Sequence, residues 1–232
     1  MPFFYIDYWY FILVVPMLIL SIVASIRVKT TYKKYNKIST QAALPATEVA
    51  KRILQQHGIS DVSVHQIAGD LTDHYNPQNK TLNLSQSTGS HATIGAIGVA
   101  AHEAGHAIQH AENYFFVKLR TAMVPIVNSG SNLDIFLAIL GLLFGGESMV
   151  VLGLALYSTV FLFTLVTLPV EFNASSRAIR ILDGMGRYTD EELSGMKKVL
   201  RAAAFTYVAS MLTALANLLR LVLLFTGRSR RR

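Results

Sequence analysis

Long apolar runs alternate with shorter polar and basic stretches along this chain. Residues 3–26 are almost wholly apolar, and a run of this length suffices for one membrane-spanning helix. Residues 149–170 and 202–226 are two further runs of spanning length, and residues 135–144 form a shorter apolar segment. This pattern predicts a predominantly α membrane protein with about four transmembrane helices.

The polar part of the chain lies mainly between residues 40 and 116. Within it, residues 47–54 have the apolar periodicity of a helix that ends near Gly58. Residues 62–67 alternate between apolar and polar positions, as a half-buried strand does. A helix followed by a strand indicates a small soluble domain of α+β type.

A hairpin and a second helix follow in the same region. Residues 71–75 and 81–85 flank the sequence Asn-Pro-Gln-Asn, in which Pro takes the position it favours in a β-turn. We therefore expect a small antiparallel sheet. The apolar stretch after it predicts a helix from about residue 90 to residue 113.

Residues 121–134 leave two interpretations open. Polar side chains lie shortly before the apolar stretch 135–144, and they include Asn128, Asn132 and Asp134. Polar groups at membrane depth should face a bundle interior or a wet cavity. Alternatively, this half of the segment lies outside the hydrocarbon and only the latter half inserts.

Composition and charge support a membrane location. The chain has 232 residues, no cysteine and a net charge of +7, and its mean hydropathy is +0.39. Without cysteine, disulfides are excluded and any metal must be bound by His and carboxylate groups. The basic residues cluster beside apolar runs, which is typical of the positive-inside rule, so we expect a lipid bilayer as partner and no nucleic acid.

The same rule orients the chain. Basic residues follow the first apolar run at once, between Arg27 and Lys37, and recur throughout residues 171–201. Both stretches are therefore predicted to be cytosolic. No basic residue precedes the first run, which favours an uncleaved anchor over a signal peptide. Four spans would leave the Arg-rich tail, residues 227–232, outside, so the side of the tail stays open.

The candidate chemistry lies in the predicted second helix, where residues 102–106 read H-E-x-x-H. Side chains four positions apart share a helix face, so His102 and His106 can both bind one Zn²⁺. Glu103 lies one step around the helix, where it can reach a metal-bound water. This is the arrangement of a zinc peptidase with Glu103 as general base.

A catalytic zinc usually has a third protein ligand. His110 is a poor candidate because a straight helix places it about 12 Å from His102 along the axis. Glu171 is a better one, since a carboxylate at the end of an apolar segment is costly unless it is paired or binds metal. Ser175 lies four residues later on the same face and could hydrogen-bond a ligand.

Two stretches of this sequence resemble a known family. Residues 102–110 and 166–175, supported by residues 71–77 and 197–204, are similar to the membrane-bound neutral zinc metallopeptidases of the YugP type. More distantly they resemble HtpX-like and CAAX-type gluzincin peptidases, which pair H-E-x-x-H with a downstream E-x-x-x-D. The resemblance implies that Glu171 is the third zinc ligand. Ser175 stands where the distant relatives have the aspartate.

These observations predict how the chain is organised. The expected segments are a transmembrane anchor (3–26), a cytosolic zincin-like metallopeptidase domain (27–120), a transmembrane hairpin (121–170), a cytosolic helix with the third ligand (171–201), a transmembrane helix (202–226) and a basic tail (227–232). The protein is expected in the cell membrane as a multi-pass protein with its active site on the cytosolic side.

The expected activity is peptide-bond hydrolysis by a zinc-activated water, with Glu103 taking the water's proton. His74 and Arg177 are candidates for substrate or transition-state contacts. The expected substrate is a peptide or protein, which includes membrane proteins and a role in their quality control. The alternatives are a catalytically inactive scaffold or pseudo-peptidase regulator, and a protease that cuts within the bilayer.

Overall fold

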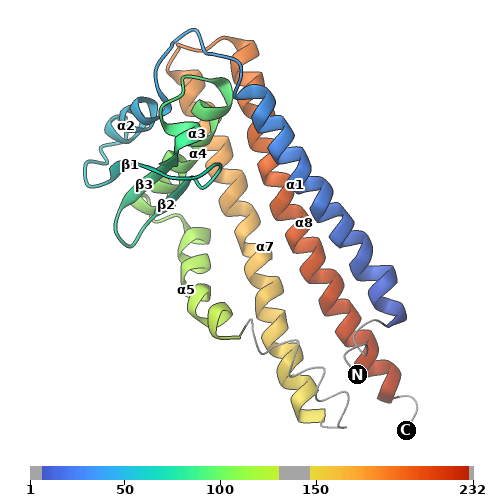
Figure 1. The fold of residues 1–232 in the computed structure, drawn as a ribbon. Helices are drawn as coiled ribbons and strands as arrows, with labels where there is room; N and C mark the ends of the chain where they lie inside the picture. The colour runs from blue at the N-terminus through green and yellow to red at the C-terminus, as the bar shows by residue number, and fades with distance from the viewer. Residues whose placement is uncertain (1–6, 131–146, 230–232) are drawn as a thin grey trace. The chain divides into compact units, whose positions relative to one another are not determined.

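The computed structural model describes residues 7–130 and 147–229 (Figure 1). Its elements are η1 (Tyr10–Val14), α1 (Val15–Tyr35), α2 (Ala46–Gln56), β1 (Ser63–Ile67), β2 (His74–Asn76), β3 (Thr81–Ser85), α3 (Gln86–Gly89), α4 (Ile94–Ala111), α5 (Phe115–Gly130), α7 (Glu147–Gly184) and α8 (Asp190–Ser229). Helices dominate, and the strands are confined to one short sheet. The predicted predominantly α class is confirmed.

The chain divides into two compact units, and α1, α7 and α8 each contribute to both. The first unit comprises Met1–Ala24, Leu119–Leu168 and Thr206–Arg232, and the second comprises Ser25–Lys118 and Pro169–Phe205. The first is built from the apolar parts of the long helices. The second contains the sheet, α2 to α4 and the polar ends of the same long helices.

Three helical segments of the described chain are long and apolar enough to span a membrane, namely Tyr10–Tyr35, Ser148–Gly184 and Asp190–Gly227. The predicted number of about four spans is not confirmed. The apolar stretch 135–144 lies outside the described residues, as do residues 131–134 and the tail from residue 230. The remainder of the ambiguous segment, residues 121–130, forms the last part of α5, a helix of 16 residues.

The first unit contains an ion pair between α8 and Asp7, which lies just before the first helix of the chain. Arg220 on α8 is 5% exposed, and its Nη2 lies 2.7 Å from Oδ2 of Asp7. The guanidinium also lies over the ring of Tyr10, at 5.1 Å from its centroid. An arginine inside an apolar segment is expected to be paired in this way.

The sheet of the second unit has the order β1-β3-β2. The β2–β3 hairpin is antiparallel as predicted, but β1 pairs with β3 in parallel, so the prediction of an all-antiparallel sheet is wrong. β3 is the central strand, and its alternating leucines, Leu82 and Leu84, are fully buried. Alternation in the sequence shows which face of a strand is buried, but it does not specify the strand's neighbours.

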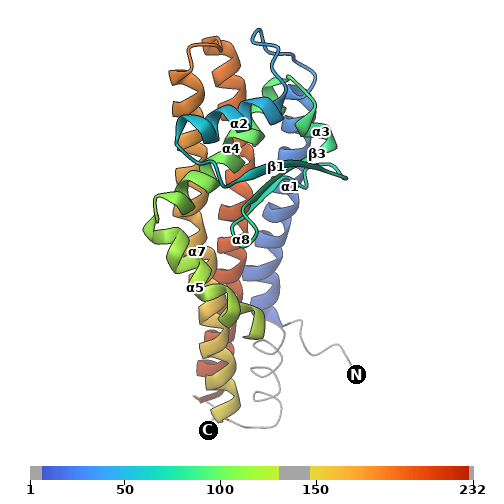
Figure 2. The same ribbon diagram turned by 90° about the vertical axis from the view of Figure 1, so that its left-hand side faces the viewer.

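The core of the second unit is formed where α2 and α4 pack together and against the sheet (Figure 2). Ile53 of α2, Ile97 of α4 and both leucines of β3 belong to one buried cluster. Thr93 caps α4 by accepting a hydrogen bond from the Ala96 N–H, and Asn113, with a φ of 56°, ends the helix in a left-handed turn. The predicted metal-binding motif, residues 102–106, therefore lies on a capped and mostly buried helix.

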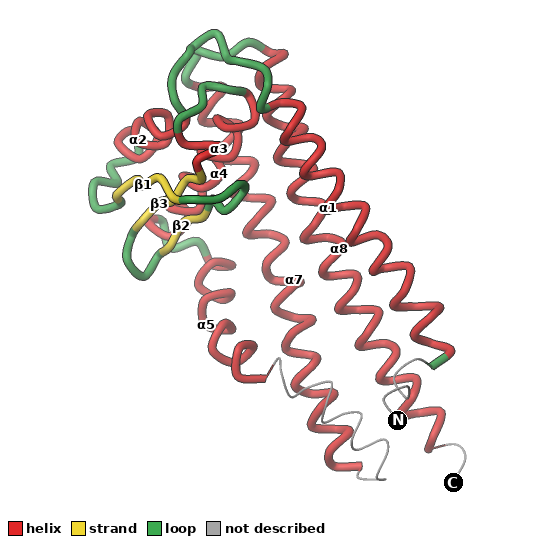
Figure 3. The backbone as a smooth tube through the Cα atoms, in the orientation of Figure 1, coloured by secondary structure: helices red, strands yellow, loops and turns green. Residues whose placement is uncertain are grey.

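The long helices α7 and α8 are continuous (Figure 3). The predicted boundary between the transmembrane hairpin (121–170) and the cytosolic helix (171–201) is not a helix end, because α7 runs from Glu147 to Gly184 through Pro169. Proline removes one backbone donor but does not always end a long helix. A capping box starts α8: the Thr189 N–H donates to the Glu192 carboxylate, and the Glu192 N–H donates to the Thr189 hydroxyl.

Candidate metal centre

The two histidines of α4 face one another across one helical turn. Their Nε2 atoms are 3.1 Å apart, and their ring centroids are separated by 4.6 Å. His106 is 9% exposed, and the residues around it on α4 are mostly small and apolar. The pair thus offers two imidazole nitrogens at one point on the helix surface.

Glu171 of α7 brings a carboxylate to the same point. Its Oε2 lies 3.4 Å from Nε2 of His102 and 3.6 Å from Nε2 of His106, and the residue is 3% exposed. One ligand atom from each of the three residues lies within 4.8 Å of the others. The structure thus brings together all three predicted metal ligands.

A glycine lets the two helices approach closely enough for this. A Cβ added to Gly105 would lie 2.9 Å from the carbonyl oxygen of Ala174, which is closer than real Cβ atoms come to backbone. Gly105 is three residues after His102, on the face of α4 that carries the histidines. Ala174 is three residues after Glu171, so this contact fixes the distance between the ligand-bearing faces of α4 and α7.

Gln109 determines which nitrogen of His106 faces the carboxylate. Its amide nitrogen donates to the Val170 carbonyl at 2.8 Å and to Asn173 Oδ1 at 2.9 Å. A backbone carbonyl can only accept, so the Gln109 Oε1, 3.0 Å from Nδ1 of His106, must be the acceptor. Nδ1 of His106 therefore carries a proton, and the Nε2 lone pair of the neutral ring is directed toward Glu171.

His102 has a comparable partner on α7. The hydroxyl of Ser175 lies 3.2 Å from its Nδ1 and can accept a hydrogen bond from an N–H at that position, which leaves Nε2 of the neutral ring as a ligand atom. Ser175 thus lies within hydrogen-bond distance of a predicted metal ligand. Each histidine is thus oriented through Nδ1 by a polar side chain.

This donor set fits Zn²⁺ or a similar divalent ion. Two imidazole nitrogens and one carboxylate are the ligands of many catalytic zinc sites. Two lone pairs and a carboxylate repel one another at these distances unless a cation lies between them. Burial lowers the pKa of His106, but the hydrogen bond and charge of Glu171, with the charge of Glu103, outweigh it, so the pKa is raised above its ordinary value. The site therefore favours positive charge.

Glu103 is held beside this centre by the edge strand of the sheet. It is 9% exposed, and its Oε2 accepts a hydrogen bond of 3.0 Å from the backbone N–H of Tyr75 on β2. The Tyr75 ring packs near His110, with 5.4 Å between the ring centroids. Consequently, the carboxylate of Glu103 has one oxygen fixed by β2, and Oε1 has no hydrogen bond to the described residues.

The other two predicted contact residues have protein partners in the structure. Nδ1 of His74 lies 2.9 Å from the Thr72 carbonyl, and its Nε2 lies 3.1 Å from Asn83, on the exposed face of the sheet. Arg177 donates through Nε to Asn173 at 2.7 Å, and its Nη1 lies 2.7 Å from Oε2 of Glu112. Their contact with substrate stays a prediction.

Sequence reasoning did not identify Gln109, Asn173 or Gly105 as parts of the site. Gln109 is fully buried in an apolar helix, so an amide three residues after the second histidine was an available signal. The roles of Asn173 and Gly105 depend on which helix packs against α4. That information is not contained in the local sequence.

Known proteins are similar to this chain over most of its length. A family model described as "Putative neutral zinc metallopeptidase" matches residues 10–226. A Bacillus subtilis (strain 168) protein named "Putative membrane protease YugP" is 43% identical over 206 residues, which cover 89% of this chain and 92% of that protein. No solved structure matches the chain.

Proposed function

The chain belongs to the neutral zinc metallopeptidase family, and from that premise we propose that it is a membrane-embedded endopeptidase with His102, His106 and Glu171 as zinc ligands. The observation that supports this most directly is the convergence of three ligand atoms from α4 and α7 within 4.8 Å. The family implies Zn²⁺, and the three donors suit it. The expected substrate is a peptide or protein at the membrane.

Zinc, when bound, supplies a Lewis acid that polarises a carbonyl and makes water a stronger nucleophile near neutral pH. In this proposal, Glu103 takes the proton from the attacking water at Oε1, because Oε2 already accepts the Tyr75 N–H. The same oxygen then delivers the proton to the leaving amine. Gln109 and Ser175 hold the two histidines through Nδ1 during the reaction.

The edge strand supports a mode of substrate binding. β2 is an outer strand of the sheet, and the hydrogen bond from Tyr75 to Glu103 ties it to the general base. An extended peptide that added to this edge would lie beside Glu103, and strand addition is a common way to bind a peptide backbone. We therefore propose an extended substrate.

The proposal also places the protein in the membrane, with its active site on the cytosolic side. The homologue is named a membrane protease, and three described helices are apolar enough to cross a bilayer. The basic residues after Ile26 and before Ala202 favour a cytosolic site by the positive-inside rule. Because the chain has no cysteine, a single cysteine at Ser90 can be labelled from one side in intact cells. Labelling only by reagents that cross the membrane is expected, and labelling by impermeant reagents would contradict the cytosolic assignment.

The decisive experiment combines metal analysis with one substitution. Purified full-length protein is expected to hold about one zinc per chain and to cleave an unstructured protein such as casein. Glu103→Gln should retain zinc and lose at least about 10²-fold in cleavage rate. Glu191→Gln, which changes an exposed glutamate of α8, is the matched control and should remain active. A zinc-free protein, or undiminished cleavage by Glu103→Gln, would favour the scaffold alternative.

A further inference from the structure

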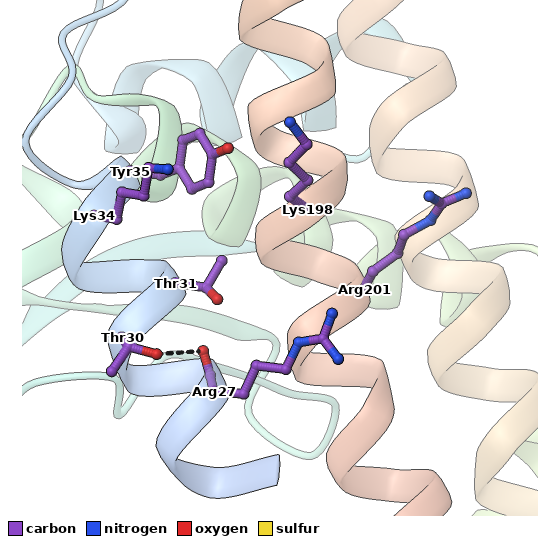
Figure 4. Close-up of a pocket in the computed structure, with 7 residues that line it drawn as sticks. All are labelled: Arg27, Thr30, Thr31, Lys34, Tyr35, Lys198 and Arg201. Atoms are coloured by element: carbon purple, nitrogen blue, oxygen red, sulfur yellow. Dashed lines mark hydrogen bonds between the residues drawn. The ribbon is translucent and has the colours of Figure 1, made fainter. Parts of the chain in front are cut away.

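A basic pocket of about 440 Å³ lies between α1 and α8 in the second unit, separate from the metal centre (Figure 4). Its lining within the described chain comprises four cationic side chains, two threonines and a tyrosine and includes no carboxylate, the residues being Arg27, Thr30, Thr31, Lys34, Tyr35, Lys198 and Arg201. A concave site with this composition is suited to an anion.

The lining residues form one face of each helix. On α1 they recur at positions i, i+3, i+4, i+7 and i+8, and on α8 at i and i+3, which are the spacings of a single helical face. The helices are close at the Tyr35 end, because a Cβ on Gly195 would come within 2.9 Å of the Tyr35 ring. The pocket is therefore a product of how these two helices pack.

Among the described residues, no carboxylate neutralises the positive charges of the pocket. In the stretches 7–130 and 147–229, no ion pair involves any of the four cationic side chains. The Arg27 guanidinium lies over the Phe205 ring of α8, at 5.9 Å from its centroid, and Figure 4 shows it extending from α1 toward α8. Four like charges around one hollow repel one another, so a bound anion would relieve the repulsion.

The position along the helices indicates which anion fits. Arg27 directly follows the apolar stretch of α1, and Arg201 directly precedes the apolar stretch of α8. The pocket therefore lies where the apolar part of each of these two candidate spans gives way to basic residues. Ile22 and Ile26 of α1 are 59% and 56% exposed. A ligand with a charged head and apolar chains matches this order of basic and apolar surface, whereas a small soluble anion uses only the basic part.

We propose that this pocket binds the phosphate headgroup of an anionic phospholipid. Arginine and lysine both bind phosphate oxygens, and basic pockets between membrane helices commonly hold lipid headgroups. The proposal differs from the general positive-inside effect because it assigns binding to one helix face. Lys29 and Lys33 lie on α1 beside the same apolar stretch, yet they do not line the pocket.

The test compares two matched charge removals in the full-length protein, purified in a neutral detergent. Arg27→Gln with Arg201→Gln removes two charges from the pocket, and Lys29→Gln with Lys33→Gln removes two from outside it. Native mass spectrometry measures binding of phosphatidylglycerol and, for comparison, phosphatidylcholine. Wild-type protein and the Lys pair should both prefer phosphatidylglycerol, and the Arg pair should bind it at least about tenfold more weakly.

Three results would overturn the proposal. The first is an equal loss of binding in both double variants, which is the outcome of diffuse charge attraction. The second is full binding by the Arg pair. The third is displacement of the lipid by inorganic phosphate at equal concentration, which would identify a soluble anion as the ligand. If the Arg pair does not fold, as judged by zinc content, Lys34→Gln with Lys198→Gln provides the same comparison. The measurement is independent of peptidase activity.

Discussion

The Oε1 of Gln109 lies 3.0 Å from Nδ1 of His106, and the other end of the same amide is fixed by α7. Gln109 thus couples the orientation of a metal ligand to the packing of the helix that carries Glu171. Such contacts to a ligand's second nitrogen are part of a metal site's affinity as well as its shape.

Gln109→Met is therefore expected to weaken zinc binding by about 10- to 100-fold, because the substitution roughly keeps the side-chain volume and removes all three hydrogen bonds of the amide. Competition with a chelating dye measures the affinity. Gln55→Met, on the exposed side of α2, is the control and should leave the affinity unchanged. Unchanged affinity in Gln109→Met would show that packing alone orients His106.

Gly105→Ala tests the close approach of α4 and α7. The added Cβ would lie 2.9 Å from the Ala174 carbonyl, so the helices must separate, at a cost of about 1–3 kcal/mol in the free energy of unfolding. Zinc content should fall as well, since the separation moves Glu171 away from the histidines. A Cβ added at Gly184 would meet nothing within 4 Å, so Gly184→Ala should be neutral in both assays. Equal behaviour of the two variants would refute the steric argument.

Removal of zinc should lower thermal stability. A ligand that binds only the folded state at 100 times its Kd contributes about 2.7 kcal/mol, so the melting temperature should fall on chelation and recover on adding zinc. Glu171→Gln should abolish this zinc dependence, while Glu191→Gln on the surface of α8 should preserve it. A zinc-dependent melting temperature in Glu171→Gln would remove Glu171 from the ligand set.

The role of Arg177 can be determined by comparing its substitution with that of its ion-pair partner, Glu112. Its Nη1 lies 2.7 Å from Glu112, a pair that is partly exposed. If its role is to hold α7 against the end of α4, Arg177→Gln and Glu112→Gln should each reduce stability slightly, with a coupling of about 0.2–1 kcal/mol, and should leave kcat nearly unchanged. A large loss of kcat in Arg177→Gln alone would instead identify a contact with the transition state.

The folded protein is expected to lose stability at high pH because of the buried hydroxyl of Tyr188. Burial, followed by the nearby charge of Glu192, raises the pKa of the Tyr188 hydroxyl to about 12. Because the folded-state pKa lies above the unfolded value of about 10, the contribution is fully present below pH 10 and is lost as the pH rises toward 12. Tyr188→Phe should therefore lose less stability than wild type between pH 10 and 12 in denaturant titrations. Parallel curves over that interval would contradict the assignment.

The metal-binding pair and the long helices followed from the sequence, because both depend on local spacing. Residues four apart on a helix share a face wherever that helix lies, so His102 and His106 are necessarily neighbours once α4 forms. Long apolar runs likewise predict membrane helices without knowledge of their partners. The reciprocal Thr189 and Glu192 cap is local for the same reason.

Tertiary structure decided how the predicted ligands come together. Glu171 is 65 residues beyond His106 in the chain, and their ligand atoms meet because α7 packs closely against α4 at Gly105 and Ala174. The direction of β1, the role of Gln109 and the hollow between α1 and α8 also depend on which surfaces pack together. Side-chain spacing within a helix is fixed by its geometry, whereas contacts between distant segments are selected by the complementarity of whole surfaces.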